Sequence, residues 1–192
     1  MINKPYGTTS QFVSVHDEPL LGDIDFPFPE GTHAIGRLDK HSEGLLLLTT
    51  DKRITSLLFQ GKVPHTRTYL VQVRFEISAE TVERLRNGVT ITIQEGKEYT
   101  TPPCDVHLTQ PPPGLFPLPF ERIDYQPTSW LLISLTEGRF HQVRKMVKAV
   151  RHRCLRLIRV SIEDMQLGDL PPGGVKEFEQ EEFFRLLKLE SR

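Results

Sequence analysis

Alternation of apolar and polar side chains predicts strands along much of the chain. Residues 67–74 alternate and are rich in β-branched and aromatic side chains, and residues 129–135 are expected to form another strand. Residues 155–162 also alternate, with arginines between the apolar positions. Residues 44–49 are almost wholly apolar, which predicts a buried strand, and a shorter strand is expected at residues 33–36.

Apolar positions at helical spacing predict four helices between and after these strands. The first follows Asp51, the second is capped by Ser78 and ends at Asn87-Gly88, and the others cover residues 140–152 and 179–189. Strands outnumber helices, and most are joined by turns or by one helix. The sequence therefore predicts an α+β fold with a central mixed, mainly antiparallel sheet and flanking helices.

Length and proline content set the expected domain organisation. A chain of 192 residues, 38% of them hydrophobic, is long enough for one ordinary domain. Residues 1–192 are therefore expected to form a single domain, with two sub-lobes sharing one sheet as the alternative. Residues 102–119 carry seven prolines, which predicts an extended surface excursion without an internal strand or helix.

The composition argues against several classes of protein. No apolar run reaches membrane-spanning length and the N-terminus lacks the apolar core of a signal peptide, so we expect a cytoplasmic protein. Cys104 and Cys154 have no CxxC spacing, which indicates two reduced thiols. His33, Asp39 and His41 could be read as metal ligands, but they lack the convergent set with supporting partners that zinc requires. Neither a metal nor another cofactor is expected.

Charge is segregated along the chain although its sum is only −1. Helical spacing places Arg144, Lys148 and Arg151 on one polar face, and Arg156 and Arg159 are expected to project from the opposite side of a sheet. A stretch of this kind favours a phosphate backbone as partner, whereas a merely solvated helix face would mix both signs. Eight basic residues and no acidic one lie in this stretch: Arg139, Arg144, Lys145, Lys148, Arg151, Arg153, Arg156 and Arg159.

One carboxylate stands out as a candidate for chemistry. Asp39 lies between Arg37 and Lys40 on a polar turn, residues 37–43, that joins two predicted strands. Loops held by a rigid sheet are common places for catalytic residues. Asp39 is therefore the candidate nucleophile.

Five stretches in the same order resemble the pseudouridine synthases, specifically the branch that modifies ribosomal RNA. The matching stretches are Asn3-Lys4-Pro5, residues 36–50 with Gly-Arg-Leu-Asp, residues 62–73 with Tyr69, residues 137–146, and residues 157–160 followed by Pro172-Gly173. Residues 85–90 and 127–131 are similar to the subgroup called 23S ribosomal RNA pseudouridine synthase E. Many relatives carry an N-terminal S4 domain, whereas here the first motif begins almost at residue 1. We therefore expect a bare catalytic domain that recognises its target alone, with loss of the first residues from this sequence as the alternative.

The resemblance implies roles for particular residues. It implies Asp39 as the catalytic carboxylate, Arg144 as its partner with Arg139 as second choice, and Tyr69 as the ring that stacks on the uracil. Attack at the sugar, attack at the base and abstraction of a ribose proton all remain open. Arg37 is long enough to fill the gap left by a flipped uridine. Leu38, Leu157 and Ile158 are expected in the uracil pocket, and the residues expected to bind RNA are Arg37, Lys40, Arg139, His141, Gln142, Lys145, Lys148 and Arg151.

Two classes of function compete. The first is an isomerase that converts a uridine of large-subunit (23S) ribosomal RNA, free or in a precursor particle, to pseudouridine and acts as a monomer without a cofactor. The second is a non-catalytic RNA-binding or ribosome-assembly module with the same fold. A metal-dependent hydrolase is a third and weaker reading. The first two differ in whether Asp39, Tyr69 and Arg144 converge in one cleft.

Overall fold

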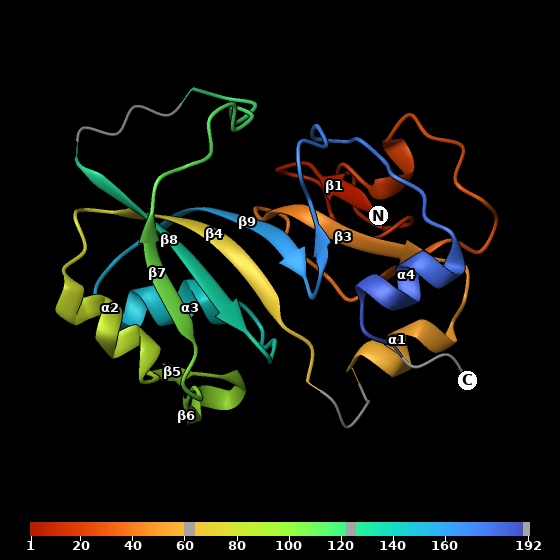
Figure 1. Ribbon diagram of the computed structural model, residues 1–192. Coiled ribbons are helices and arrows are strands. Elements are labelled where there is room, and N and C mark those ends of the chain that lie inside the picture. Colours follow the sequence, from red (N-terminus) through yellow and green to blue (C-terminus); the bar gives the residue numbers. More distant parts are fainter. Residues whose placement is uncertain (60–63, 122–125, 190–192) are drawn as a thin grey trace. The chain divides into compact units, whose positions relative to one another are not determined.

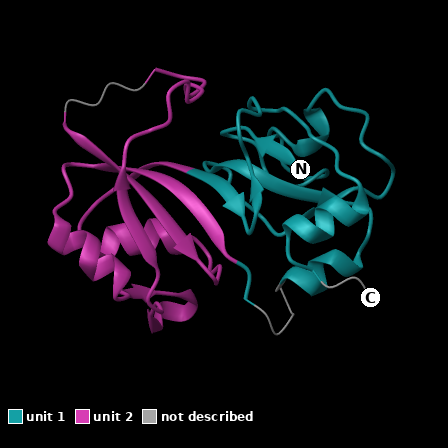
Figure 2. Cartoon of the chain, in the orientation of Figure 1, with its two compact units in different colours: residues 1–65, 158–192 teal, residues 66–157 magenta. Residues whose placement is uncertain are grey.

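The computed structural model describes residues 1–59, 64–121 and 126–189 (Figure 1). The first two residues of the matching stretch 62–73 therefore lie outside the described residues. The chain forms two compact units, one of residues 1–65 and 158–192 and the other of residues 66–157 (Figure 2). β3 pairs parallel with β9 and antiparallel with β1 and β2, and β8 pairs antiparallel with β4 and β7. Helices accompany the strands in both units, so the predicted mixed α+β class is confirmed.

Strand β3 organises the first unit. β1 runs antiparallel to β3 with Lys4 opposite Gly44, and β2 pairs antiparallel with the other end of β3. β9 runs parallel to β3 with Arg159 opposite Gly44. β10 pairs with the end of β9. The elements are β1 (Ile2–Lys4), β2 (His33–Ile35), β3 (Glu43–Thr49), α1 (Arg53–Phe59), the end of β9 (Cys154–Ile162), β10 (Met165–Gln166) and α4 (Gln180–Leu186).

The core of the first unit lies where α1 and α4 meet β3. Asp51 accepts a hydrogen bond from the Arg53 backbone N–H at 2.9 Å, as expected for a residue that starts a helix. The helices predicted after Asp51 and at residues 179–189 are both present, although α4 is shorter than predicted. The buried cluster consists of Met1, Ile35, Leu45, Leu47, Ile54, Leu58, Ile162, Met165, Phe184 and Leu187.

The second unit is built on a long antiparallel pair. β4 pairs with β8 along its whole length, from Arg67 opposite Leu135 to Arg74 opposite Thr128. α2 packs against β7 and α3 against β5. Ser78 caps α2 as predicted, since its side chain accepts a hydrogen bond from the Thr81 N–H. The elements are β4 (Arg67–Arg74), α2 (Ala79–Arg86), β5 (Thr90–Thr92), β6 (Glu98–Thr100), β7 (Asp105–Thr109), β8 (Thr128–Leu135), α3 (Gln142–Ala149) and the start of β9.

The proline-rich segment contains a strand, contrary to the prediction. β7 (Asp105–Thr109) pairs with β8 and is the last strand in the order of its sheet. Prolines at 102–103 and 111–113 flank the strand and none lies within it. Proline is tolerated beside an edge strand because it removes no internal ladder hydrogen bond there. The prediction counted prolines over the whole segment and so overlooked the proline-free residues 104–110.

Helix α3 is shorter than the predicted 140–152. His141, which precedes it, has φ of +56°, and Arg151, which follows it, has φ of +66°. The Arg151 N–H donates to Lys148 O and the His152 N–H to Val147 O, both at 2.9 Å, which is the Schellman pattern of helix ends. A left-handed residue at each end thus confines the helix to Gln142–Ala149.

The two arginines of β9 are buried, which corrects the prediction that they project from the sheet. Arg156 donates from Nη2 to Phe116 O at 2.8 Å, and Arg159 donates from Nε to Leu45 O at 2.7 Å. These cations hold backbone carbonyls inside the protein. The exposed part of the basic stretch consists of Arg139, Lys148, Arg151 and Arg153.

Replacing Gly44 with alanine should strongly destabilise the first unit. Gly44 has φ of +99°, and a Cβ there would lie 2.4 Å from Arg159 O and 2.9 Å from Arg159 N. The clash is with backbone, so β3 and β9 would have to separate. We expect Gly44→Ala to lower the free energy of unfolding by at least about 2 kcal/mol in urea.

Gly31→Ala is the matched control for that change. Gly31 also has a positive φ, +82°, but a Cβ there would meet nothing within 4 Å. Its cost should be only about 1 kcal/mol, from the backbone conformation alone. Equal losses in the two variants would show that close packing at Gly44 is unimportant.

Candidate active site

Asp39 lies on the loop of residues 36–42 between β2 and β3 of the first unit. Its carboxylate is half-buried, whereas the Arg37 and Lys40 side chains beside it are exposed. The Ser42 N–H donates to Asp39 O at 2.9 Å, and the Ser42 hydroxyl lies 3.5 Å from Asp39 Oδ2. The loop therefore closes as a turn that presents one carboxylate between two cations.

The N-terminal segment holds this loop through its backbone. Ser10 Oγ donates to Leu38 O at 2.8 Å and accepts from Leu38 N at 3.1 Å. The Gly7 N–H donates to Lys40 O at 2.8 Å. The backbone on both sides of Asp39 is thus fixed by residues about 30 positions earlier in the chain.

Beneath the loop lies a fully buried lysine. Lys4 has no exposed surface, and its Nζ donates to Thr8 O at 2.6 Å, Pro5 O at 2.9 Å and Lys40 O at 3.3 Å. Burial lowers the pKa of Lys4 to about 8, and the Glu43 and Asp39 carboxylates oppose that shift. Sequence reasoning assigned Lys4 no role, although it belongs to the first matching stretch.

The predicted exposed turn at residues 37–43 is partly internal. Glu43 is buried and is the first residue of β3, and Leu38 and Ser42 are also buried. Arg37, Lys40 and His41 of the turn are exposed, and Asp39 is half-buried. The apolar–polar pattern could not show this because Ser42 and Glu43 are polar.

Other side chains of the loop also have neighbours within the first unit. The His41 and Tyr6 rings lie 5.1 Å apart, and Lys40 Nζ is 3.1 Å from a Glu18 carboxylate oxygen. Hydrogen bonds from Thr9, Lys40 and Ser14 lower the pKa of Glu18, with Thr9 the largest contributor. Lys40, predicted to bind RNA, therefore already has an anionic partner.

The remaining predicted catalytic residues belong to the second unit. Tyr69 is buried on β4 opposite Ile133 of β8. Arg144 is half-buried on α3, and its Nη1 lies 3.6 Å from Cys154 Sγ. Because Asp39 lies in the first unit, the convergence of these three residues stays a prediction. Leu38 and Ile158 of the first unit and Leu157 of the second, predicted for the uracil pocket, are all buried.

A polar network precedes α3 in the second unit. Gln142, predicted to bind RNA, is buried; its Oε1 accepts from Arg139 N at 2.8 Å and its Nε2 donates to Glu137. Tyr99 donates to the Glu137 carboxylate at 2.6 Å, and the Arg139 guanidinium lies over the Tyr99 ring at 3.7 Å. Sequence reasoning assigned neither Tyr99 nor Glu137 a role, although Glu137 is the first residue of the matching stretch 137–146.

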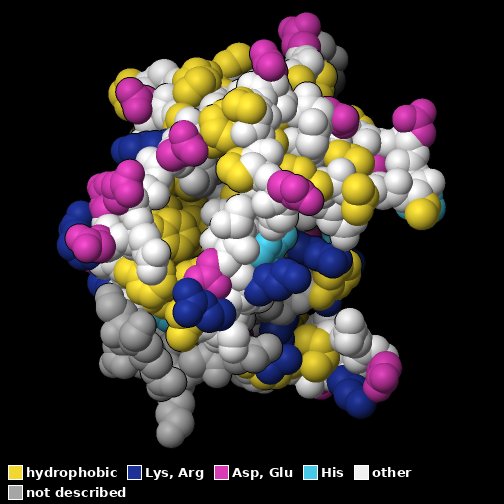
Figure 3. Space-filling view, turned by 90° about the vertical axis from the view of Figure 1, so that its right-hand side faces the viewer, with side chains coloured by type: hydrophobic (Ala, Val, Ile, Leu, Met, Phe, Trp, Pro, Cys, Tyr) yellow, Lys and Arg dark blue, Asp and Glu magenta, His cyan; other side chains and the backbone are white. Residues whose placement is uncertain are grey.

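Charged side chains gather unevenly on the surface. On the face shown in Figure 3, several Lys and Arg side chains lie close to a histidine, and Asp and Glu side chains are spread over the face, some of them next to Lys or Arg. None of the helices in the described part of the chain is long and apolar enough to cross a membrane. Within residues 1–59, 64–121 and 126–189, no group of three or more His, Cys, Asp and Glu is placed to hold a metal ion.

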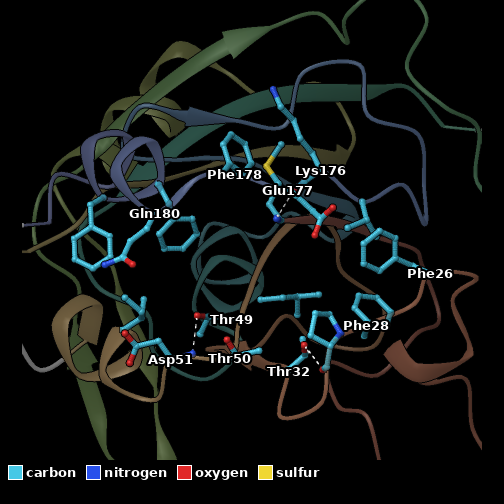
Figure 4. Close-up of a pocket in the computed structure, with 17 residues that line it drawn as sticks. Phe26, Phe28, Thr32, Thr49, Thr50, Asp51, Lys176, Glu177, Phe178 and Gln180 are labelled. Atoms are coloured by element: carbon cyan, nitrogen blue, oxygen red, sulfur yellow. Dashed lines mark hydrogen bonds between the residues drawn. The ribbon is translucent and has the colours of Figure 1, made fainter.

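A separate cavity of about 330 Å³ in the first unit lies at the other end of β3 from Asp39 (Figure 4). Phe26, Phe28 and Phe178 contribute aromatic walls, and Thr49 and Asp51 mark where β3 ends. It contains none of the predicted site residues. The candidate active site is therefore built around the Asp39 loop and not around this cavity.

Comparison with known proteins settles the family. The profile of the RNA pseudouridylate synthase family matches residues 1–149. The chain belongs to this family. This pseudouridine synthase is 39% identical, over 90% of its own length and 89% of the relative's, to "Ribosomal large subunit pseudouridine synthase E" of Xanthomonas axonopodis pv. citri. It is 38% identical to the protein of the same name from Vibrio parahaemolyticus, over 93% of its length and 73% of the relative's.

A solved structure supports the fold of the pseudouridine synthase. The crystal structure of a pseudouridylate synthase superposes with a TM-score of 0.74 at 26% identity, covering 96% of this chain and 71% of that one. The resemblance stated from the sequence motifs is thereby confirmed, and so is the prediction that the protein is an enzyme. Lys4, Asp39 and the loop of residues 36–42 that carries Asp39 lie within the matched residues 1–149.

Lys4→Met should change how stability depends on pH. The pKa of Lys4 is about 8 in the folded protein and 10.5 for an ordinary lysine, so the unfolded state binds more protons between these values. Lys4 therefore makes the free energy of unfolding rise with pH from about 8 to 10.5. The free energy of unfolding of the wild type should therefore rise relative to that of Lys4→Met by on the order of 1–3 kcal/mol across this range.

Urea unfolding at several pH values between 7.5 and 10 would measure this difference. Lys52→Met, at an exposed position before α1, is the matched control and should track the wild type. A difference between wild type and Lys4→Met that stays constant with pH would contradict the depressed pKa.

Proposed function

We propose that this pseudouridine synthase isomerises a uridine of large-subunit ribosomal RNA, with Asp39 as the catalytic nucleophile. The names of the two relatives support the RNA class. The observation that carries the assignment of Asp39 is its place on a loop whose backbone is held on both sides by Ser10 and Gly7. The substrate is free or particle-bound ribosomal RNA, and the enzyme acts in the cytoplasm.

The reaction exchanges one bond to the ribose for another. The bond from C1′ to uracil N1 breaks, a bond from C1′ to C5 forms, the hydrogen at C5 leaves as a proton and N1 gains one. The balance requires no oxidant or reductant. Asp39 serves this exchange by attacking the sugar or the base, or by taking a ribose proton. All three routes need a carboxylate oxygen held at a fixed position, which the tethered loop provides.

The other predicted residues are assigned supporting roles. Arg144 orients the Asp39 carboxylate, Tyr69 stacks on the uracil, and Leu38, Leu157 and Ile158 form apolar walls. The buried state of Tyr69 and of the three apolar side chains is compatible with a site that excludes water. Arg37 is exposed beside Asp39 and occupies the space that the flipped uridine leaves.

Asp39→Asn should abolish turnover while preserving the fold and RNA binding. The amide keeps the shape of the carboxylate and loses its nucleophilic charge, so release of tritium from C5-labelled large-subunit ribosomal RNA should fall at least about a thousandfold. Urea unfolding and a filter-binding assay check that fold and affinity persist. Substantial residual release by Asp39→Asn would exclude Asp39 as nucleophile. If the wild-type protein itself binds the RNA but releases no tritium, the RNA-binding module is favoured.

Loss of exposed cations around α3 should weaken RNA binding and its dependence on salt. Arg151 occupies a left-handed position, so Arg151→Gly removes the charge and favours the backbone conformation. Lys148→Glu reverses an exposed charge one turn earlier. Each change should reduce the slope of log affinity against log salt by about one unit.

Arg84→Glu, an exposed cation of α2 in the same unit, is the control for these variants. It should leave the slope unchanged. If Arg151→Gly and Lys148→Glu also leave it unchanged, this face of α3 does not contact RNA.

A further inference from the structure

Phe140 presents its ring to solvent just before α3. Its side chain is 64% exposed, which makes it the most exposed phenylalanine of the described residues. The His141 ring stacks on it, with centroids 3.8 Å apart and planes inclined by 18°. The pair therefore presents a flat aromatic face to solvent.

The backbone holds this pair in place. His141 has φ of +56°, an uncommon conformation for a residue other than glycine. The Gln142 side chain bonds to Arg139 N, and the Gln142 N–H donates to Arg139 O at 3.0 Å. The Glu137 carboxylate accepts a hydrogen bond from Gln142 Nε2. The turn is therefore fastened at its base while its outermost ring remains exposed.

One cation lies beside the exposed ring. Lys145 Nζ is 5.4 Å from the centre of the Phe140 ring, whereas the guanidinium of Arg139, the preceding residue, lies over the Tyr99 ring. Lys145 has a long, flexible side chain that can turn from the ring to a nearby anion. An aromatic surface bordered by a cation complements a nucleotide, whose base stacks while its phosphate carries charge.

We propose that Phe140, backed by His141, stacks on an unpaired nucleobase of the RNA while Lys145 contacts the adjacent phosphate. The inference rests on the proposed RNA substrate and adds a binding position for a base other than the uridine at Asp39. Charge favours this occupant over an apolar protein surface, which would gain nothing from Lys145. The two are separated by the experiment below.

The test uses three replacements of Phe140 in the full chain. Phe140→Ala should weaken binding of unstructured oligouridylate and of large-subunit ribosomal RNA about tenfold, because one base loses its stacking partner. Phe140→Trp should bind like the wild type, and its fluorescence should fall when oligouridylate binds. Phe140→Leu should bind like Phe140→Ala, since leucine has apolar area without an aromatic face. KM should rise in Phe140→Ala while kcat at saturating RNA stays within about twofold.

Two controls sharpen the result. Duplex RNA carries phosphates without unpaired bases, so it should not quench Phe140→Trp beyond the change that Trp130 gives in the wild type. Phe75→Ala removes another exposed phenylalanine with a cation nearby, Arg74 at 5.9 Å, and should leave affinity unchanged.

Unchanged affinity in Phe140→Ala, full rescue by Phe140→Leu, or equal quenching by duplex RNA would each overturn the stacking proposal. The leucine result would indicate an apolar contact such as another protein provides. The quenching experiment does not depend on turnover. If the wild type binds oligouridylate but releases no tritium from ribosomal RNA, the proposed function fails while the stacking site remains.

Discussion

The site depends on the close approach of three strands at Gly44. Lys4 of β1 lies opposite Gly44 on one side and Arg159 of β9 on the other. A Cβ at Gly44 would overlap the Arg159 backbone, so only glycine allows β9 to run beside β3 at this point. The contact fixes the start of β3 at Glu43. It thereby also fixes the end of the loop that carries Asp39, at residue 42. The position of the Asp39 carboxylate is thus a consequence of strand packing.

Buried cations complete this arrangement by binding carbonyls. A buried charge is costly unless hydrogen bonds satisfy it. Lys4 meets that condition with three carbonyl oxygens and the nearby Glu43 carboxylate, and Arg159 binds the Leu45 carbonyl. Backbone carbonyl oxygens near Asp39 and Gly44 therefore accept hydrogen bonds from the Lys4 and Arg159 side chains. Burial of Arg156 and Arg159 also reduces the number of cations that the basic stretch exposes.

The sequence predicted the regular elements well and the irregular ones poorly. Alternation located β4 and β9, and the Asp39 turn followed from the strands on either side. β7 was missed because prolines surround it, and the ends of α3 were missed because left-handed residues, His141 and Arg151, set them. The tethers from Ser10 and Gly7 join residues far apart in the chain. No local pattern carries such information.

Net charge helps to explain why recognition needs defined contacts. At −1 the protein gains little long-range attraction for RNA, and Lys40 already pairs with Glu18. Affinity must then come from a few exposed cations and from rings placed by rigid turns. Contacts of this kind depend on the shape of the RNA and on unpaired bases, whereas phosphate attraction alone does not. The proposed reaction at one uridine among many would benefit from that balance, because weak general attraction limits binding to the wrong sites.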